Sequence, residues 1–467
     1  MSKFVCVGVV MVLAVSLAGG RTPSSPVVDT GQVRCYGNGI EIAYPKGSGA
    51  YFGQDAQYVG NTPRYKNNGD GTVSDLVTGL IWQKTPDFVK RTHGDTQKYA
   101  DGLKLAGHSD WRVPTIKELF SLADFRGNMR TQTPYIDTKA FDFKYPEGTR
   151  GGSGRPGQRD MDGQYRSSTQ YVGTTMGRDK SVFGFNFADG RIKGYPKRAK
   201  QYVRCVRGKK GYGENKLKDN GDGTITDAST GLIWQKGDSV KTLNWKQALG
   251  YAEGLELAGH DDWRLPNVKE LQTIVDYRWA PDATDRSKRR AAIDPIFKLT
   301  ATESWFWSGT THIENAYGYY VCFGQGLSAR KIRGKQMNAH GAGCVRSDPK
   351  EGDPKDWSEG HGPQGDQVRI YNYVRCVRGG VATPNTKGPA PKKSTGPVRT
   401  ERPERGGSSG VALDRFIKRL DKNGDGKVSK REFDGPADHF DHMDKNSDGY
   451  LDASEAPTGP PTRIRRR

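Results

Sequence analysis

NNGDGTVSDLVTGLIWQK at residues 67–84 returns almost unchanged as DNGDGTITDASTGLIWQK at residues 219–236. The stretches that follow also match, since YVRCVRG closes each of them, at 202–208 and again at 373–379. Between these motifs, YADGLKLAGHSDWRVPTIKELFSLADF in the first copy corresponds to YAEGLELAGHDDWRLPNVKELQTIVDY in the second. A repeat of this length indicates one structural unit used twice. The sequence therefore predicts a duplicated domain.

The second copy opens with the pattern of a β-hairpin. Asp222 and Gly223 form a turn signal between polar neighbours, and alternating Thr and Ile follow at 224–226. A second apolar run at 232–235 comes after a Thr-Gly pair. Turn residues flanked by short alternating runs are typical of two antiparallel strands.

Two helices are expected after this hairpin. From Leu243 onward, apolar residues recur at intervals of three and four, which predicts a helix with one buried face that Gly259 ends. Pro266 stands near the start of a second helix. The apolar stripe of that second helix consists of Val268, Leu271, Ile274 and Val275.

Short strands in Gly-rich surroundings complete the copy. The runs at 305–308, 319–324 and 368–378 are rich in aromatic and β-branched residues. Each copy is thus expected to be a small α+β domain with two helices beside antiparallel strands.

The order of the motifs GDGT, TGLIWQ, AGH followed by DWR, KEL and YVRCVRG resembles that of the Lcl C-terminal domain family. This family is named for the end module of a bacterial collagen-like adhesin, and the resemblance covers residues 32–379. It implies a compact α+β module related in architecture to C-type lectins and carried by exported proteins. The best-understood member binds sulfated glycosaminoglycans, so the resemblance implies a glycan ligand.

Two departures distinguish the copies. Asn67 stands where the second copy has Asp219, so a metal site in that loop would lack a ligand in the first copy. The second copy also carries a long insert at 328–371, and Cys322 and Cys344 flank part of it. We favour a disulfide between these two cysteines.

The shared motifs are interpreted as structural. The Trp-Arg pairs at 111–112 and 263–264 could stack on a sugar and hold an anion. A position between two helices nevertheless favours core anchors. His108 and His260 follow the Gly expected to end the first helix of each copy, so we also expect structural roles for them.

The N-terminus has the pattern of a secretory signal peptide. Lys3 precedes an apolar run at 4–17, and small residues lead to a cleavage site after Ala18. A retained membrane anchor is the alternative, but the run is shorter than the roughly 20 residues that cross a bilayer. We therefore expect an exported protein that is secreted, periplasmic or attached to the cell surface, and its five remaining cysteines can pair in an oxidising compartment.

The net charge of +20 indicates a polyanionic partner. Part of the excess lies in a Pro-rich stretch at 380–410 and in a terminal run of arginines. No nucleic-acid recognition motif accompanies the charge. For an exported chain we expect an acidic or sulfated polysaccharide, or another cell-surface component.

Two calcium-binding loops follow the linker. DKNGDGKVSKRE begins at Asp421, and DKNSDGYLDASE begins at Asp444. Both fit the 12-residue EF-hand pattern, in which a hard cation takes six to eight oxygens and a Gly permits the sharp turn. Val428 and Leu451 occupy the position at which paired loops exchange a short β-contact. The predicted ligands are Asp421, Asn423, Asp425, Lys427 through its carbonyl, Ser429 and Glu432, then Asp444, Asn446, Asp448, Tyr450 through its carbonyl, Asp452 and Glu455.

The expected fold class is therefore α+β, with two tandem C-type-lectin-like modules followed by a small all-α EF-hand pair. The predicted segments are a signal peptide at 1–18, domains at 32–208 and 216–379, a linker at 380–410, the EF-hand pair at 411–457 and a basic tail at 458–467.

The leading functional expectation is a non-catalytic, calcium-binding adhesion or glycan-binding protein. A purely structural envelope or matrix protein with calcium-stabilised modules is the alternative. No enzyme motif is present. An oxidase-like use of the lectin architecture, the third hypothesis, needs paired reactive cysteines that we cannot place in this sequence.

Overall fold

The computed structural model divides the chain into two compact units. The main unit comprises residues 1–354 and 360–392, and the second comprises 355–359 and 393–467. The predicted signal peptide and basic tail lie outside the described residues. These are 23–47, 49–129, 131–146, 162–312, 316–332, 334–385 and 388–389, with 420–421, 427–430, 432–433, 440 and 449–451 near the C-terminus. Within these ranges, no helix has the length and hydropathy needed to cross a membrane.

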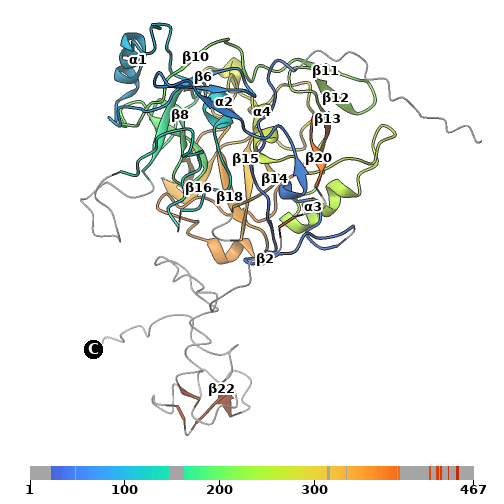
Figure 1. The fold of residues 1–467 in the computed structure, drawn as a ribbon. Coiled ribbons are helices and arrows are strands. Elements are labelled where there is room, and N and C mark those ends of the chain that lie inside the picture. Colours follow the sequence, from blue (N-terminus) through green and yellow to red (C-terminus); the bar gives the residue numbers. More distant parts are fainter. Residues whose placement is uncertain are drawn as a thin grey trace, which may run out of the picture. The chain divides into compact units, whose positions relative to one another are not determined.

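Short strands and a few short helices make up the main unit (Figure 1). The elements up to the end of the first copy are β1 (Cys35–Tyr36), β2 (Glu41–Ile42), η1 (Asp55–Gln57), β3 (Tyr58–Val59), β4 (Tyr65–Asn67), β5 (Thr72–Asp75), β6 (Ile81–Gln83), α1 (His93–Gly102), α2 (Ile116–Ser121), β7 (Gln164–Gln170), β8 (Ser181–Asn186), β9 (Arg191–Pro196) and β10 (Val206–Arg207).

The second copy repeats the order from β4 to β10 and adds the hairpin formed by β16 and β17 and the short helices η2 and η3. Its elements are β11 (Leu217–Asp219), β12 (Thr224–Asp227), β13 (Leu232–Gln235), α3 (Trp245–Glu253), α4 (Val268–Thr273), η2 (Arg286–Lys288), β14 (Trp305–His312), β15 (Tyr317–Cys322), β16 (Leu327–Ile332), β17 (Lys335–Asn338), β18 (Val345–Pro349), η3 (Pro354–Trp357) and β19 (Val377–Gly379), followed by β20 (Thr383–Pro384).

The hairpin predicted for the second copy is confirmed. Thr224 pairs with Gln235 and Asp227 with Leu232, so β12 and β13 are antiparallel neighbours. They belong to a four-stranded sheet of order β11-β12-β13-β19, and the first copy forms the matching sheet β10-β6-β5-β4. Trp234, at the middle of this pairing, is fully buried.

Helix starts are set by capping side chains. Asn267 accepts a hydrogen bond from the backbone N–H of Glu270, and the Glu270 side chain accepts one from Asn267 in return. This capping box satisfies two donors that a helix N-terminus otherwise leaves free. Thr115 and Glu118 form the same box at α2.

The first helix of the second copy is shorter than predicted. α3 ends at Glu253, and Gly254 is its C-cap, so Gly259 does not end it. Ala258 and Gly259 instead have positive φ values of 55° and 73° at the centre of a tight turn. A type I′ turn requires that conformation at both central residues, and Gly adopts it without strain.

The two copies share one sheet. Its six antiparallel strands run β14-β15-β18-β9-β8-β7, with three strands from each copy, and Ile192 of β9 pairs with Val345 of β18 at the junction. The prediction of tandem modules did not foresee this pairing. The 328–371 segment, interpreted as an insert, contains β18 and therefore contributes a central strand.

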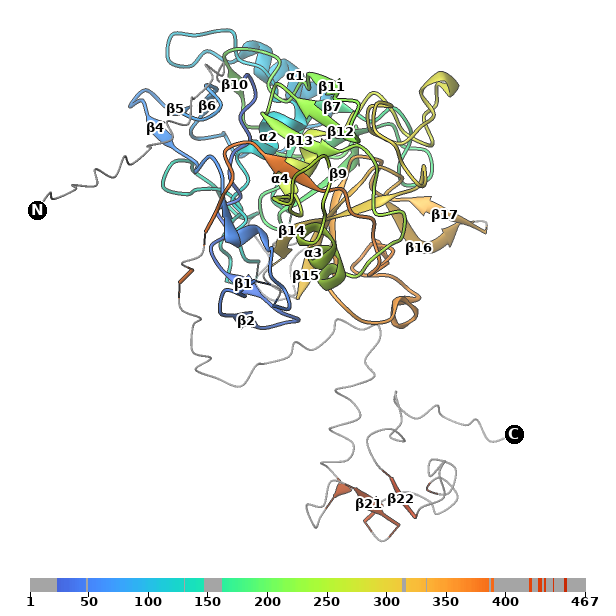
Figure 2. The same ribbon diagram turned by 90° about the vertical axis from the view of Figure 1, so that its right-hand side faces the viewer.

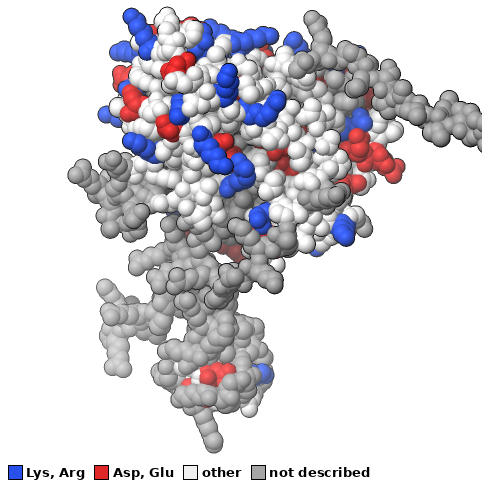
Figure 3. Space-filling view, viewed as in Figure 1, with Lys and Arg blue, Asp and Glu red and all other residues white. Residues whose placement is uncertain are grey.

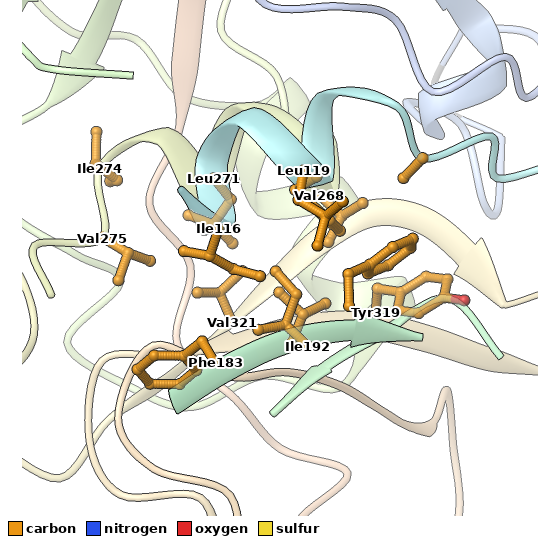
Figure 4. Close-up of a cluster of buried hydrophobic side chains, with 14 of the residues drawn as sticks. Ile116, Leu119, Phe183, Ile192, Val268, Leu271, Ile274, Val275, Tyr319 and Val321 are labelled. Carbon is orange, nitrogen blue, oxygen red and sulfur yellow. The ribbon is translucent and has the colours of Figure 1, made fainter. Parts of the chain in front are cut away.

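Helices α2 and α4 lie side by side on this sheet and bury one apolar core built from both copies. Figure 4 shows Ile116 and Leu119 of α2 beside Val268 and Leu271 of α4, above side chains of the sheet that include Val321. All of these side chains are fully buried. Burial of each large aliphatic side chain contributes about 1.5–3 kcal/mol, so the shared core strongly favours the joined arrangement.

The segment that precedes the first copy's motifs packs on the second copy. The Gln32 side chain donates a hydrogen bond to the Thr311 carbonyl of β14, and the buried Lys350 ammonium donates to the Tyr36 carbonyl at 2.9 Å. Figure 2 shows β1 and β2 beside β15, and β16 and β17 projecting as a hairpin elsewhere. Residues predicted as the start of the first domain thus cover the second copy.

The second unit contains a small sheet of β21 (Val428–Ser429) and β22 (Tyr450–Leu451). Val428 pairs with Leu451, as the sequence predicts for the two loops. Leu420 and Phe440 complete a buried cluster with them. The helices expected around these loops lie mostly outside the described residues.

Candidate functional site

The Trp-Arg motifs are core anchors, which confirms their structural interpretation. Trp263 is 1% exposed, and its indole N–H donates to the Leu257 carbonyl at 3.2 Å. Arg264 forms two hydrogen bonds of 2.7 and 2.6 Å with the buried Glu270 carboxylate. The equivalent Trp111 is 3% exposed. These residues are therefore closed to a sugar ligand.

The two histidines of the repeat close the tight turn through their backbones. His260 exchanges backbone hydrogen bonds of 3.0 and 3.1 Å with Leu257, and His108 does the same with Leu105. Both imidazoles are exposed. Their structural role thus belongs to the backbone rather than to the ring.

All five cysteines of the described residues are buried thiols. Cys322, the last residue of β15, faces Cys344, which directly precedes β18; their sulfur atoms are 3.1 Å apart without a disulfide. The favoured bond is therefore absent, although the favoured pair lies together. Burial raises the pKa of Cys322 well above its ordinary value, and the adjacent Cys344 raises it further.

A basic surface on the first copy combines ammonium groups with aromatic rings. The Lys90 nitrogen lies 5.0 Å from the Tyr202 ring centroid, and the Lys144 nitrogen lies 4.9 Å from that of Phe88. The two rings pack edge to face with centroids 6.4 Å apart. We use the name basic surface for Phe88, Lys90, Lys144, Lys197, Lys200 and Tyr202.

Two chain segments are joined to form this surface. Arg91 and Gln201 exchange backbone hydrogen bonds of 2.8 and 2.9 Å, and the His93 N–H donates to the Lys197 carbonyl at 3.0 Å. The segment before α1 is thereby held against the segment after β9. Burial lowers the pKa of Lys90, and the Asp162 carboxylate partly opposes that shift.

Sequence reasoning missed this surface, although the charge balance of the copies points to it. Residues 32–208 contain 28 Lys or Arg against 17 Asp or Glu, whereas residues 216–379 contain 23 against 21. In Figure 3, Lys and Arg gather over the part of this face where Figure 1 places α1, β6 and β10, with some acidic side chains among them. The basic excess of the folded part thus belongs to the first copy.

Part of the predicted calcium site can be described. The Ser429 N–H and hydroxyl donate to Glu432 Oε2 at 2.9 and 2.7 Å, which orients the carboxylate predicted to close the first loop. Gly449 has the positive φ of 81° that a sharp turn at the sixth loop position requires. Asp421, Lys427 and Tyr450 are also described. The remaining predicted ligands, Asn423, Asp425, Asp444, Asn446, Asp448, Asp452 and Glu455, lie outside the described residues.

The described candidates offer carboxylate, hydroxyl and carbonyl oxygens, which are the ligand types that a hard cation takes. Among all described residues, those of the second unit included, no group of three or more His, Cys, Asp or Glu side chains is placed to hold a metal. The calcium ligands therefore remain a prediction for the second unit.

Comparison with known proteins identifies the repeat. The Lcl C-terminal domain family matches residues 71–207 and 223–346, more than half of the chain. These two matches coincide with the two copies that share the central sheet. No curated protein matches the sequence. The chain belongs to the Lcl C-terminal domain family and carries two copies of the domain.

Proposed function

We propose that this chain is an exported, calcium-binding protein whose first Lcl C-terminal domain binds an acidic or sulfated polysaccharide. The observation that carries the proposal is the basic surface, in which cations alternate with aromatic rings. Sulfate and carboxylate groups of a polysaccharide pair with ammonium groups. The half-buried Phe88 ring can pack on a sugar face, whereas Tyr202, at 7% exposed, belongs to the buried core. The second copy has nearly balanced charge, so it serves mainly as the partner that completes the shared core.

The calcium module supports the same proposal in a different way. Its two loop sequences fit the EF-hand pattern, and the described part brings Val428 and Leu451 into β-contact. Bound calcium would neutralise the acidic side chains of the two loops. The loops would then supply the calcium-binding part of the proposed function.

A purely structural envelope role is the second candidate. Three side chains of the motifs that identify the family, Trp263, Arg264 and Lys269, are buried and hydrogen-bonded within the protein. They build the fold and leave no polar group directed at a ligand. This observation favours a scaffold role for the motifs themselves and assigns ligand binding to residues outside them.

Binding of the full chain to immobilised heparin and to an unsulfated polyuronate at 150 mM salt tests the proposal. The variant K90M/K144M should bind heparin at least tenfold more weakly than the wild type. The matched control K218M/K241M removes two exposed lysines from the second copy and should bind normally. Equal losses in both variants would assign retention to net charge alone and would favour the scaffold role.

A further inference from the structure

Arg166 is a buried cation with no carboxylate partner in the described part of the chain. Its side chain lies on β7 and is 0% exposed. One terminal nitrogen donates to the Ala199 carbonyl, whereas Nε and Nη1 have no acceptor. The adjacent Gln201 side chain is 1% exposed, and neither its amide oxygen nor its amide nitrogen has a partner.

Other buried arginines of this fold donate more hydrogen bonds to carbonyl oxygens than Arg166 does. Arg204 donates through its two terminal nitrogens to the carbonyl oxygens of Gln83, Lys84 and Asp142. The equivalent Arg375 makes four such bonds in the second copy. Leaving a buried charged group with a single neutral hydrogen bond is costly, because desolvation is not repaid. Arg166 is therefore an exception that packing does not explain.

The second copy has no cation at the place of Arg166, although it keeps a buried amide, Asn372, at the place of Gln201. Trp307 is the counterpart of Arg166, and it pairs with Tyr320 as Arg166 pairs with Gly184. Trp245 begins α3 as His93 begins α1. The three aromatic residues belong to one apolar cluster with both indole N–H groups hydrogen-bonded. The first copy has Arg, Gly and His where the second has a filled aromatic core.

The surroundings of Arg166 are positive. Burial lowers the pKa of His93, and the charges of Arg166 and Lys197 lower it further. Burial also lowers the pKa of Arg166 to about 10, and only Tyr195 opposes that shift. The Ala199 carbonyl that Arg166 contacts belongs to the segment 197–200, which also carries the half-buried Lys197 and the exposed Lys200. Arg166 thus contacts the chain segment that carries two lysines of the basic surface.

We propose that Arg166, the Gln201 amide and His93 bind a tetrahedral oxyanion, such as a sulfate or phosphate ester. The anion would supply acceptors for the Arg166 donors and for the Gln201 amide, and it would neutralise the local charge. To reach the site the anion must pass the turn at 197–200, and the lysines of this turn attract the anion. Assigning the oxyanion to a sulfated glycan rests on the proposed function, whereas the site itself does not.

Calorimetric titration of the full chain with inorganic sulfate and with inorganic phosphate, at constant ionic strength, tests the site. The wild type should show saturable binding of at least one ion. The R166M variant should bind the ion at least tenfold more weakly than the wild type, and the Q201L variant should show a smaller loss of affinity. R286M makes the same substitution at an exposed arginine of the second copy and should bind as the wild type does.

A stability measurement separates ligand binding from a structural role. Because R166M removes an unpaired buried charge, the variant should unfold in ion-free buffer at the same temperature as the wild type or at a higher one. A clearly lower unfolding temperature would make Arg166 a structural residue and overturn the proposal. Absence of saturable binding to both ions, or equal binding by R166M, would also overturn it.

Organic esters then identify the source of the oxyanion. A sulfated disaccharide that binds more tightly than glycerol phosphate, and that loses this affinity in R166M, assigns the site to a glycan. The opposite preference assigns it to a phosphate-bearing polymer and supports the oxyanion site while contradicting the glycan proposal. If the K90M/K144M variant no longer binds heparin but still binds inorganic sulfate, the basic surface and the oxyanion site bind their ligands independently.

Discussion

Lys117 and Lys269 occupy the same position in the two copies, and each donates a hydrogen bond to a carbonyl oxygen at the helix end of the other copy. The Lys117 nitrogen lies 2.6 Å from the Thr273 oxygen of α4, and the Lys269 nitrogen lies 3.0 Å from the Ser121 oxygen of α2. These carbonyls belong to the last residues of their helices, which lack partners within the helix and favour a nearby cation. The lysines of the KEL motif thus join the copies reciprocally.

This arrangement predicts an unusual pH dependence. Burial lowers the pKa of Lys269 from 10.5 to about 8. Between these values the unfolded chain binds more protons than the folded chain, so the free energy of unfolding should rise with pH. The contribution of Lys269 is at most about 3 kcal/mol across that interval.

Urea unfolding at pH 7, 8, 9 and 10 measures this contribution as the difference between wild type and K269M. The free energy of unfolding of K269M should rise less with pH than that of the wild type. The control K98M removes an exposed lysine of α1 and should follow the wild type. Parallel curves for wild type and K269M would show that the buried amine keeps its ordinary pKa.

The duplicated ion pairs predict a difference between the copies. Arg264 and Glu270 have side chains that are each 5% exposed, whereas the equivalent Arg112 is 19% exposed beside a buried Glu118. R264M leaves the Glu270 carboxylate buried without its partner and should cost about 3–5 kcal/mol. R112M should cost less, because water reaches that site.

Chemical denaturation of the two variants tests the ranking. The double variant R264M/E270M should recover part of the loss, since it removes the uncompensated charge, but it also loses the helix cap that Glu270 makes. A larger loss in R112M than in R264M would contradict the role assigned to burial.

Local features of this fold were predictable, and non-local ones were not. The β12–β13 hairpin depends on the turn and the alternating residues between 222 and 235, which are contiguous. The pairing of Ile192 with Val345 depends on two segments far apart in the sequence, and neither segment marks its partner. The helix expected to reach Gly259 was too long because a positive-φ turn and a helix C-terminus both favour Gly.

The same distinction applies to the sites. A calcium loop is a contiguous pattern of 12 residues, so its ligands can be named from the sequence. The basic surface requires Lys90 beside Tyr202, and the oxyanion site requires the backbone contact of Arg166 with Tyr202, the neighbour of Gln201. Charge counts indicate which copy is basic, but only the folded chain brings these residues together.

The paired thiols predict one specific disulfide. Cys322 and Cys344 are cross-strand neighbours, and the Cys322 N–H donates to the Cys344 carbonyl at 3.0 Å. Because burial raises the pKa of Cys322, the folded chain should oxidise slowly, and the bond should form while the chain folds. For a loop of roughly 20 residues, this bond should add about 3 kcal/mol to stability.

Peptide mapping after refolding in oxidised and in reduced glutathione checks this pairing. The oxidised sample should join Cys322 to Cys344, and C322S should show no bond and no added stability. Cys376 lies in the same buried cluster, so a bond from Cys376 to either cysteine is the outcome that contradicts the prediction.

Calcium binding should depend on the closing glutamate of each loop. Ser429 holds the Glu432 carboxylate by two hydrogen bonds, so E432Q keeps the size of the side chain and removes the charge that a calcium ion needs. Titration of chelator-treated full chain should show two sites, with affinities near the range of about 10⁻⁴–10⁻³ M found in extracellular modules. E432Q and E455Q should each lose one site, whereas E214Q, at an exposed residue of the main unit, should lose none.

Chelator should leave the main unfolding transition unchanged, because every predicted ligand lies in the second unit. A large chelator effect on that transition would place a structural ion in the Lcl C-terminal domains, and no binding by the wild type at millimolar calcium would refute the loop assignment.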